Sequence, residues 1–130
     1  MDLITINRRE GLAFEIRARH HAVTSDMSPG DGGADAGLAP VELLAGSLGA
    51  CIAMNVQRYC EMCGHADGDV AVHLTVELAD RPKRISAIVV DVELPGGVPK
   101  SRHDAVRRIA EQCVIHETLK DPPRLDVDIL

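Results

Sequence analysis

The segment Pro40-Val41-Glu42-Leu43-Leu44-Ala45-Gly46-Ser47-Leu48-Gly49-Ala50-Cys51 has the pattern of an amphipathic helix. Proline is favoured in the first turn of a helix because its missing N–H has no partner there, and Glu42 follows where the helix dipole stabilises a carboxylate. One apolar stripe is formed by residues three or four positions apart: Leu44, Leu48, Cys51, Ile52 and Asn55. We therefore predict a helix from Pro40 to about His65, ended by Gly64, with Cys51 on its apolar face.

The rest of the chain predicts strands on both sides of this helix and a second helix after them. Alternating apolar and polar residues predict extended segments over residues 2–7, 12–25, 70–78, 85–94 and 125–130. A turn is expected at residues 9–11, a glycine-rich loop at 28–37, and a helix from Lys100 to Cys113. This order predicts an α+β fold in which mostly antiparallel sheets pack on two main helices.

Length and composition restrict the protein further. With 130 residues the chain is expected to form a single domain, residues 1–130, whose core is aliphatic because only Phe14 and Tyr59 are aromatic. A net charge of −6 argues against a nucleic-acid partner. No apolar segment approaches the roughly 20 residues needed to span a membrane, and the N-terminus does not have the pattern of a signal peptide. A cytoplasmic location is expected.

The chain contains four cysteines, too few for a disulfide scaffold at this length. Cys51 and Cys113 each lie on the apolar side of a predicted helix. Two thiols that meet can cycle between dithiol and disulfide, whereas a buried cysteine often serves only as a small hydrophobe. From the residues alone, both interpretations stay open.

Both cysteine segments resemble the hallmark segments of the OsmC/Ohr family of thiol-dependent peroxidases. In that family a helix led by proline, glutamate and leucine carries the first cysteine, and a Cys-Pro-Val-His-like segment carries the second. The chain follows this pattern in Cys113-Val114-Ile115-His116, with Val114 where proline is usual. The resemblance covers almost the whole chain. It implies the OsmC-like fold, an intertwined homodimer with central long helices, and no metal or cofactor.

The resemblance also implies a peroxidase cycle used in oxidative-stress defence. Cys51, as a thiolate, would attack an organic hydroperoxide, or hydrogen peroxide, and become a sulfenic acid. Cys113 would then attack this sulfenic acid and form a disulfide. A small dithiol or a lipoylated protein would restore both thiols.

Activation of Cys51 needs a cation or hydrogen-bond donors, because burial alone favours the neutral thiol. In the organic-peroxide branch of the family an arginine after the first strand has this role, held by a glutamate ten residues before the cysteine. Arg9 aligns best with this arginine, with Arg17 and Arg19 as alternatives. Val41 occupies the glutamate position, and Glu42 would lie roughly 180° around the helix from Cys51. Glu42 is expected either to support the site or to act as a helix N-terminal charge. The departure places the chain with the broad OsmC-like group rather than with Ohr.

Other features leave alternatives open. His116 either donates a hydrogen bond near the thiol pair or caps local structure. Cys60-Glu61-Met62-Cys63 is expected to pack the helix or form a surface dithiol rather than bind zinc, since no second ligand pair follows. His20-His21 is not expected to bind a metal.

Two rival functions remain for the chain. One is a non-catalytic protein of the same fold that binds a small apolar ligand in its dimer cleft. The other is a purely structural role for both cysteines.

Overall fold

The alternation at the N-terminus forms an antiparallel sheet of three strands. The computed structural model describes residues 2–65 and 67–130, and the chain forms two compact units, residues 1–45 and 46–130. The first unit contains β1 (Ile4–Glu10), β2 (Ala13–Ala18) and β3 (His21–Ser25), in the order β1-β2-β3. The α+β fold with antiparallel strand pairing is confirmed, while the single domain of residues 1–130 stays a prediction.

Two turns of this sheet differ from the sequence prediction. The turn expected at residues 9–11 begins only at Gly11. The strand β1 continues to Glu10, and the chain reverses at Gly11, whose φ is +54°. Glycine adopts such positive φ values without steric cost. The expected segment 12–25 is divided by a turn at Arg19, which also has a positive φ (56°). Arg9 therefore lies within β1, next to an irregularity in the β1–β2 register, and not in a turn.

The loop after β3 is organised around one buried carboxylate. Asp26, 2% exposed, accepts backbone hydrogen bonds from Met27 (2.7 Å), Ala34 (3.1 Å) and Ala36 (3.1 Å). The N–H groups of Ala36 and Met27 hold the pKa of the Asp26 carboxyl below its usual value, and this effect outweighs burial. The short 3-10 helix η1 (Pro29–Asp31) lies within this loop. The predicted loop is therefore confirmed, and it is ordered by Asp26.

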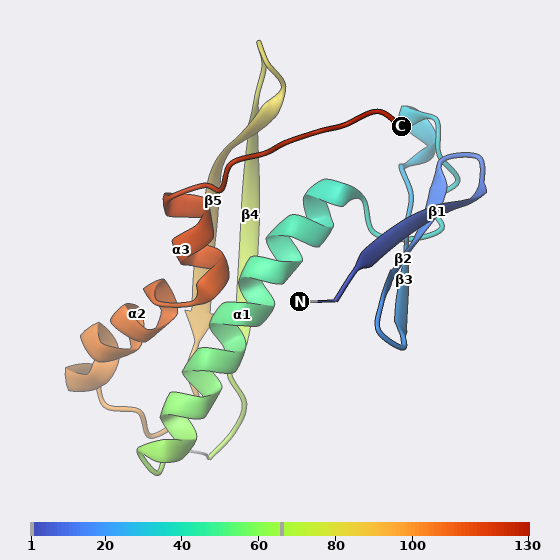
Figure 1. The fold of residues 1–130 in the computed structure, drawn as a ribbon. Coiled ribbons are helices and arrows are strands. Elements are labelled where there is room, and N and C mark those ends of the chain that lie inside the picture. Colours follow the sequence, from blue (N-terminus) through green and yellow to red (C-terminus); the bar gives the residue numbers. More distant parts are fainter. Residues whose placement is uncertain (1, 66) are drawn as a thin grey trace. The chain divides into compact units, whose positions relative to one another are not determined.

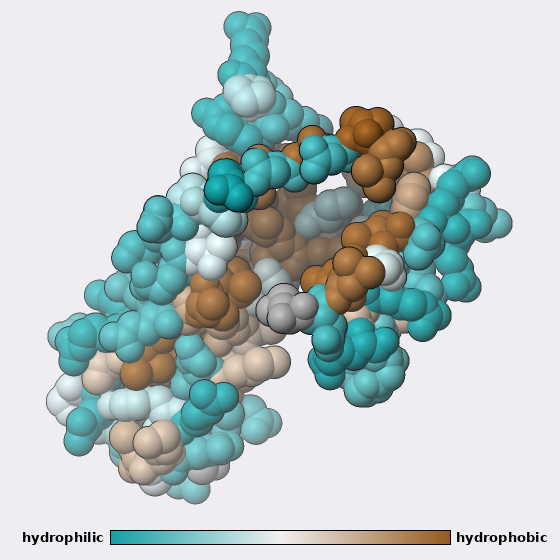
Figure 2. All heavy atoms as spheres, viewed as in Figure 1, coloured by the Kyte–Doolittle hydropathy of each residue, from teal (hydrophilic) through white to brown (hydrophobic). Residues whose placement is uncertain are grey.

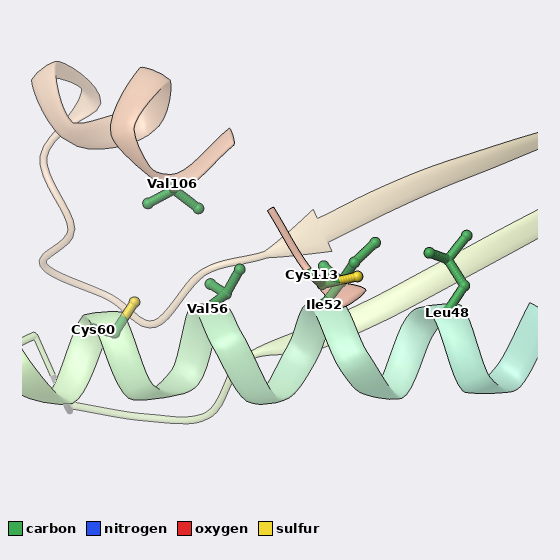
Figure 3. Packing of buried hydrophobic residues seen from close by; sticks show 6 residues of the cluster. All are labelled: Leu48, Ile52, Val56, Cys60, Val106 and Cys113. Atoms are coloured by element: carbon green, nitrogen blue, oxygen red, sulfur yellow. The ribbon is translucent and has the colours of Figure 1, made fainter. Parts of the chain in front are cut away.

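The predicted first helix is present as α1 (Pro40–Met62). It starts at the expected proline and ends close to Gly64, whose φ is +75°. The residues that α1 contributes to the buried core cluster are four positions apart, and Figure 3 shows them on one side of the helix: Leu48, Ile52, Val56 and Cys60. The stripe differs from the expected one, since Leu44 is 40% exposed.

In the second unit this stripe packs against a β-hairpin. The strands β4 (Ala71–Ala79) and β5 (Arg84–Glu93) pair antiparallel, and Figure 1 shows them running beside α1. Alternate residues of the hairpin contact the core: Val72, Leu74, Ile88, Val90 and Val92. The tip of the hairpin is hydrophilic (Figure 2), as the basic segment 81–84 predicts. Every second residue of a strand points to the same side, so these aliphatic side chains form one face of the hairpin, and this face packs against the core.

The C-terminal region departs most from the prediction. The expected helix from Lys100 to Cys113 is a 3-10 helix, η2 (Lys100–Arg102), followed by α2 (His103–Glu111), and a further helix, α3 (Val114–Lys120), begins after Cys113. The expected strand at residues 125–130 is wrong, because these residues have no pairing partner among the described residues and are exposed. Alternation alone does not form a strand without a neighbour to bond.

Within residues 2–65 and 67–130, none of the helices combines the length and apolar character that crossing a bilayer requires.

Gly49 of α1 lies against the side chain of Leu74 in β4. A Cβ atom at this position would lie 2.5 Å from Cδ1 of Leu74. We expect Gly49→Val to lower the free energy of unfolding by about 2 kcal/mol, because the core must shift to admit the side chain. In a Leu74→Ala background the cost should fall by roughly 1 kcal/mol. Urea unfolding of the four proteins measures this, and equal costs in both backgrounds would contradict the contact.

Candidate active site

Cys51 lies in the middle of α1, next to the buried stripe. It is half-buried and packs against the core that Ile52 belongs to. The backbone position of Cys51 is fixed, because residues 40–62 form one uninterrupted α-helix. Cys51 is therefore an accessible thiol on a rigid element.

Cys113 lies where the C-terminal helical region is interrupted. Its backbone is extended (φ −69°, ψ 147°), and it is the N-cap residue of α3. Its Sγ accepts a hydrogen bond from the backbone N–H of His116, with an N to Sγ distance of 3.2 Å. The side chain is fully buried. The sulfur thus takes the position that a serine or aspartate oxygen commonly has at a helix start.

The structure brings the two thiols together. The Cys113 thiol donates a hydrogen bond to the sulfur of Cys51, and the backbone N–H groups of Ile115 and Val114 donate to the same sulfur. Burial raises the pKa of the Cys51 thiol, but these three donors outweigh burial, and the net pKa lies below that of an ordinary thiol. Cys51 is therefore suited to be a thiolate.

Cys113 has the opposite character. Burial is the main cause that raises the pKa of its thiol, and the neighbouring Cys51 sulfur adds to this effect. The His116 N–H acts against burial without reversing it. Cys51 therefore ionises more readily than an ordinary thiol, while Cys113 stays protonated and donates its S–H group to Cys51. Such a division fits a nucleophile and a resolving thiol.

Val114 gives the departure from the family pattern a physical meaning. Proline, usual at this position in the family, has no backbone N–H. Valine keeps the N–H, and this group donates to Cys51. The substitution thus adds one hydrogen-bond donor to the sulfur.

Arg9 belongs to the first unit and Cys51 to the second, so activation of Cys51 by Arg9 remains a prediction. Within its unit, Arg9 Nη1 lies 2.6 Å from a carboxylate oxygen of Glu15, and Arg17 Nε lies 2.6 Å from the other oxygen. The carboxylate that holds Arg9 thus comes from β2 and not from α1. The sequence analysis missed Glu15. The β1–β2 register, which brings residues 9 and 15 near each other, was the signal that could have found it.

Glu42 and His116 have mostly local contacts. Glu42 Oε1 accepts a hydrogen bond from the N–H of Ala39, the residue before α1, at 2.9 Å. This contact matches the interpretation of Glu42 as a helix N-terminal charge. His116 contacts the thiol pair through its backbone N–H and not through its side chain. Its buried Nδ1 has no hydrogen-bond partner among the described residues.

The remaining candidates lie apart from the thiol pair. Cys60 is fully buried in the core, which confirms its packing role, while Cys63 is exposed. All four cysteines are free thiols. The rings of His20 and His21 lie next to each other at a tilt of 40°, with centroids 4.0 Å apart. Within residues 2–65 and 67–130, no cluster of three or more histidine, cysteine or acidic side chains is suited to a metal.

Comparison with known proteins gives the same fold. The chain is similar to a candidate osmotic stress and detoxification response protein from Psychrobacter arcticus, with 15% identity, coverage of 91% of this chain and 88% of the other, and a TM-score of 0.82. An OsmC-like protein from Mycoplasma pneumoniae is 16% identical over 92% and 86% of the two chains, with a TM-score of 0.79. An organic hydroperoxide resistance protein OsmC from Legionella pneumophila is 17% identical over 92% and 90%, with a TM-score of 0.61.

No curated protein sequence matches the chain. The sequence profile of the family described as OsmC-like protein matches residues 30–128, which include both cysteines of the thiol pair. The matched region covers most of the 130 residues. The chain therefore belongs to the OsmC-like protein family.

Proposed function

We propose that this protein reduces organic hydroperoxides through its Cys51–Cys113 pair. The observation that carries the proposal is the hydrogen bond between the two thiols, together with the backbone donors that lower the pKa of Cys51. The similarity in fold to a protein named for organic hydroperoxide resistance supports it. OsmC-like proteins are associated with stress-related redox functions.

In the first step the Cys51 thiolate attacks the terminal oxygen of the hydroperoxide. A sulfur–oxygen bond forms, the O–O bond breaks, and the alkoxide leaves with a proton as the alcohol. Sulfur is oxidised to a sulfenic acid while the peroxide is reduced. The N–H groups of Ile115 and Val114 supply the donors that keep the attacking sulfur ionised.

In the second step Cys113 resolves the sulfenic acid. Its sulfur attacks Cys51, the sulfur–oxygen bond breaks, and water leaves with the thiol proton, which gives a Cys51–Cys113 disulfide. The two thiols already interact in the reduced protein, so their sulfurs start near each other. A dithiol reductant, either a small dithiol or a lipoylated protein, then restores both thiols and becomes a disulfide itself. A reducing cytoplasm would suit this cycle.

We further propose that Arg9 contributes positive charge to the site in the assembled protein. The ion pair with Glu15 holds its guanidinium in one orientation. Leu48 belongs to the core, while Leu44 (40% exposed) and Met54 (65%) lie at the surface and are available to an organic substrate.

The proposed assembly is a homodimer, since OsmC-like proteins are generally oligomeric. The C-terminal segment supports this: Leu125 (84%), Val127 (84%) and Ile129 (91%) alternate with charged residues and are almost fully exposed. Such a segment exposes apolar side chains that a second copy can cover.

The cysteine roles predict distinct products with cumene hydroperoxide. One equivalent should convert the wild type to a Cys51–Cys113 disulfide within seconds, because the two thiols already interact. Cys113→Ser should stop at a Cys51 sulfenic acid that dimedone traps. Cys51→Ser should lose turnover with dithiothreitol to the background rate. Peptide mass spectrometry and peroxide consumption measure these outcomes.

Cys63→Ser is the matched control for the cysteine variants, because it removes an exposed thiol outside the pair. It should keep full turnover and the same disulfide. Undiminished turnover in Cys51→Ser would sink the proposed function.

The pKa of Cys51 predicts how alkylation depends on pH. The rate of Cys51 modification by iodoacetamide should rise with a midpoint below the value of about 8.5 for an ordinary thiol. Val114→Pro removes one donor, yet proline suits the first position of a helix, so the midpoint should move to higher pH. Val114→Ala keeps the N–H and should leave the midpoint unchanged. Equal midpoints in all three proteins would show that this donor has no influence.

The assembly proposal is tested by light scattering after size-exclusion chromatography. The wild type should have about twice the 14.0 kDa chain mass. Val127→Asn with Ile129→Asn should weaken the dimer roughly hundredfold, because two apolar side chains lose their burial. Asp126→Asn with Asp128→Asn is the control and should keep the dimer. A monomeric wild type, or equal behaviour of both double variants, would refute the role of this segment.

A further inference from the structure

The end of α1 carries a second pair of cysteines, which the proposed peroxidase cycle does not use. Cys60 lies in the last turn of the helix, and Cys63 follows its last residue, Met62. The side chain of Cys60 is fully buried, and Figure 3 shows it on the same side of the helix as Val56. Cys63 is exposed. One thiol of this pair is therefore open to solvent, while the other is closed to it.

Backbone hydrogen bonds fix the positions of both cysteines. The N–H of Cys63 donates to the carbonyl oxygen of Tyr59, with an N to O distance of 3.0 Å, so the helical ladder continues through Cys63. The N–H of His65 donates to the carbonyl oxygen of Cys60 at 2.7 Å. Together with the positive φ of Gly64 (75°), this bond closes the helix as a Schellman motif. The two cysteines thus lie three residues apart on one ordered helix end.

This spacing suits a disulfide. Residues three apart in an α-helix have Cα atoms about 5 Å apart, and a disulfide needs a Cα separation of roughly 4.4–6.8 Å. The two thiols also influence each other: burial raises the pKa of the Cys60 thiol, and the charge of the neighbouring Cys63 raises it further. The pair therefore has the same division as Cys51 and Cys113, in which one thiol is accessible and its buried partner stays protonated.

The surroundings favour thiol–disulfide exchange over metal binding. A structural zinc site takes four ligands, and the part of the chain that the structure describes contains no group of even three histidine, cysteine or acidic side chains suited to a metal. Exchange needs only an accessible attacking thiol and a second thiol within reach of it. Cys63 supplies the first and Cys60 the second.

The second pair is separate from the first. Cys51 and Cys60 lie nine residues apart on α1, which corresponds to about 13.5 Å along the helix axis. A thiol must reach bonding distance of a disulfide sulfur to attack it, so the two pairs cannot exchange directly within one chain. Any oxidant of the second pair must therefore come from solution.

We propose that Cys60 and Cys63 form a second redox-active dithiol, which reacts with small disulfides. The Cys63 thiolate attacks one sulfur of the small disulfide, the S–S bond breaks, and one small thiol leaves with the proton that Cys63 lost. Cys60 then attacks the sulfur of Cys63, a Cys60–Cys63 disulfide forms, and the second small thiol leaves with the proton of Cys60. The protein dithiol is oxidised by two electrons, and the small disulfide is reduced to two thiols. The inference does not depend on the proposed peroxidase activity, because neither Cys51 nor Cys113 takes part.

The test treats the reduced full chain with excess 2-hydroxyethyl disulfide in the absence of denaturant. Remaining thiols are blocked with iodoacetamide, and mass spectrometry follows the tryptic peptide 59–83, which contains Cys60 and Cys63 but neither cysteine of the first pair. This peptide should lose two hydrogens and take up no iodoacetamide. Cys60→Ala should stop at a mixed disulfide between 2-mercaptoethanol and Cys63. Cys63→Ser should leave Cys60 unreacted, because its thiol is buried.

Cys51→Ser is the control, because it disables the first pair and keeps the second. It should form the Cys60–Cys63 disulfide as fast as the wild type, even though it loses peroxide turnover. If Cys60→Ala does not fold, a time course in the wild type replaces it, and the mixed disulfide on Cys63 should appear first and decay as the internal disulfide forms.

Four results would overturn the proposal. The first is that both thiols of peptide 59–83 still take up iodoacetamide after treatment. The second is that the mixed disulfide on Cys63 persists in the wild type. The others are an internal disulfide that forms only in urea, and a reaction that is lost in Cys51→Ser.

Discussion

The packing of one face of α1 against the β4–β5 hairpin forms the core of the second unit, and the position of the thiol pair depends on it. Side chains at four-residue intervals on α1 meet alternate side chains of both strands, and Val106 of α2 contacts the same cluster. Gly49 permits this approach, because Leu74 occupies the space that a larger residue would need. Cys51 lies next to Ile52, so the same packing fixes where its sulfur can be.

The chemistry of the thiol pair follows from the interruption between α2 and α3. If one helix had continued through Cys113, its backbone N–H groups would have bonded within the helix. Instead α3 begins there, and the first N–H groups of a helix lack internal partners. Two of them donate to Cys51 and a third to Cys113. The environment that lowers the pKa of Cys51 and raises that of Cys113 thus includes backbone N–H groups and the other thiol, besides burial.

Periodicity predicted the elements that local pattern determines. The start of α1 at Pro40 and the alternation of β4 and β5 are confirmed, because these patterns match the burial that each element achieves. The strand at residues 125–130 was wrong, since a strand needs a neighbour that sequence pattern does not supply. The turn near Arg9 was misplaced because Gly11, and not Arg9, has the required positive φ.

The candidate site was less predictable than the fold. The residues Cys51 and Cys113 were found through resemblance, but their contact arises from tertiary packing between distant segments. The donors from Val114 and Ile115 are backbone groups, which any residue except proline would provide. The sequence predicts a cation or hydrogen-bond donors beside Cys51, but only arginine side chains could be named as candidates from sequence. Glu15 was missed because its pairing with Arg9 depends on strand register.

The distribution of oxidisable side chains has a consequence for durability. Among the described residues, the fully buried core holds aliphatic side chains and two cysteines, with no methionine and no aromatic ring. Met54 and Met62 lie at the surface, 65% and 81% exposed. Conversion of an exposed methionine to its sulfoxide disturbs little packing, whereas the same change in a core is disruptive. Oxidation of these two methionines would therefore disturb little packing, and both lie where methionine sulfoxide reductases can reach them.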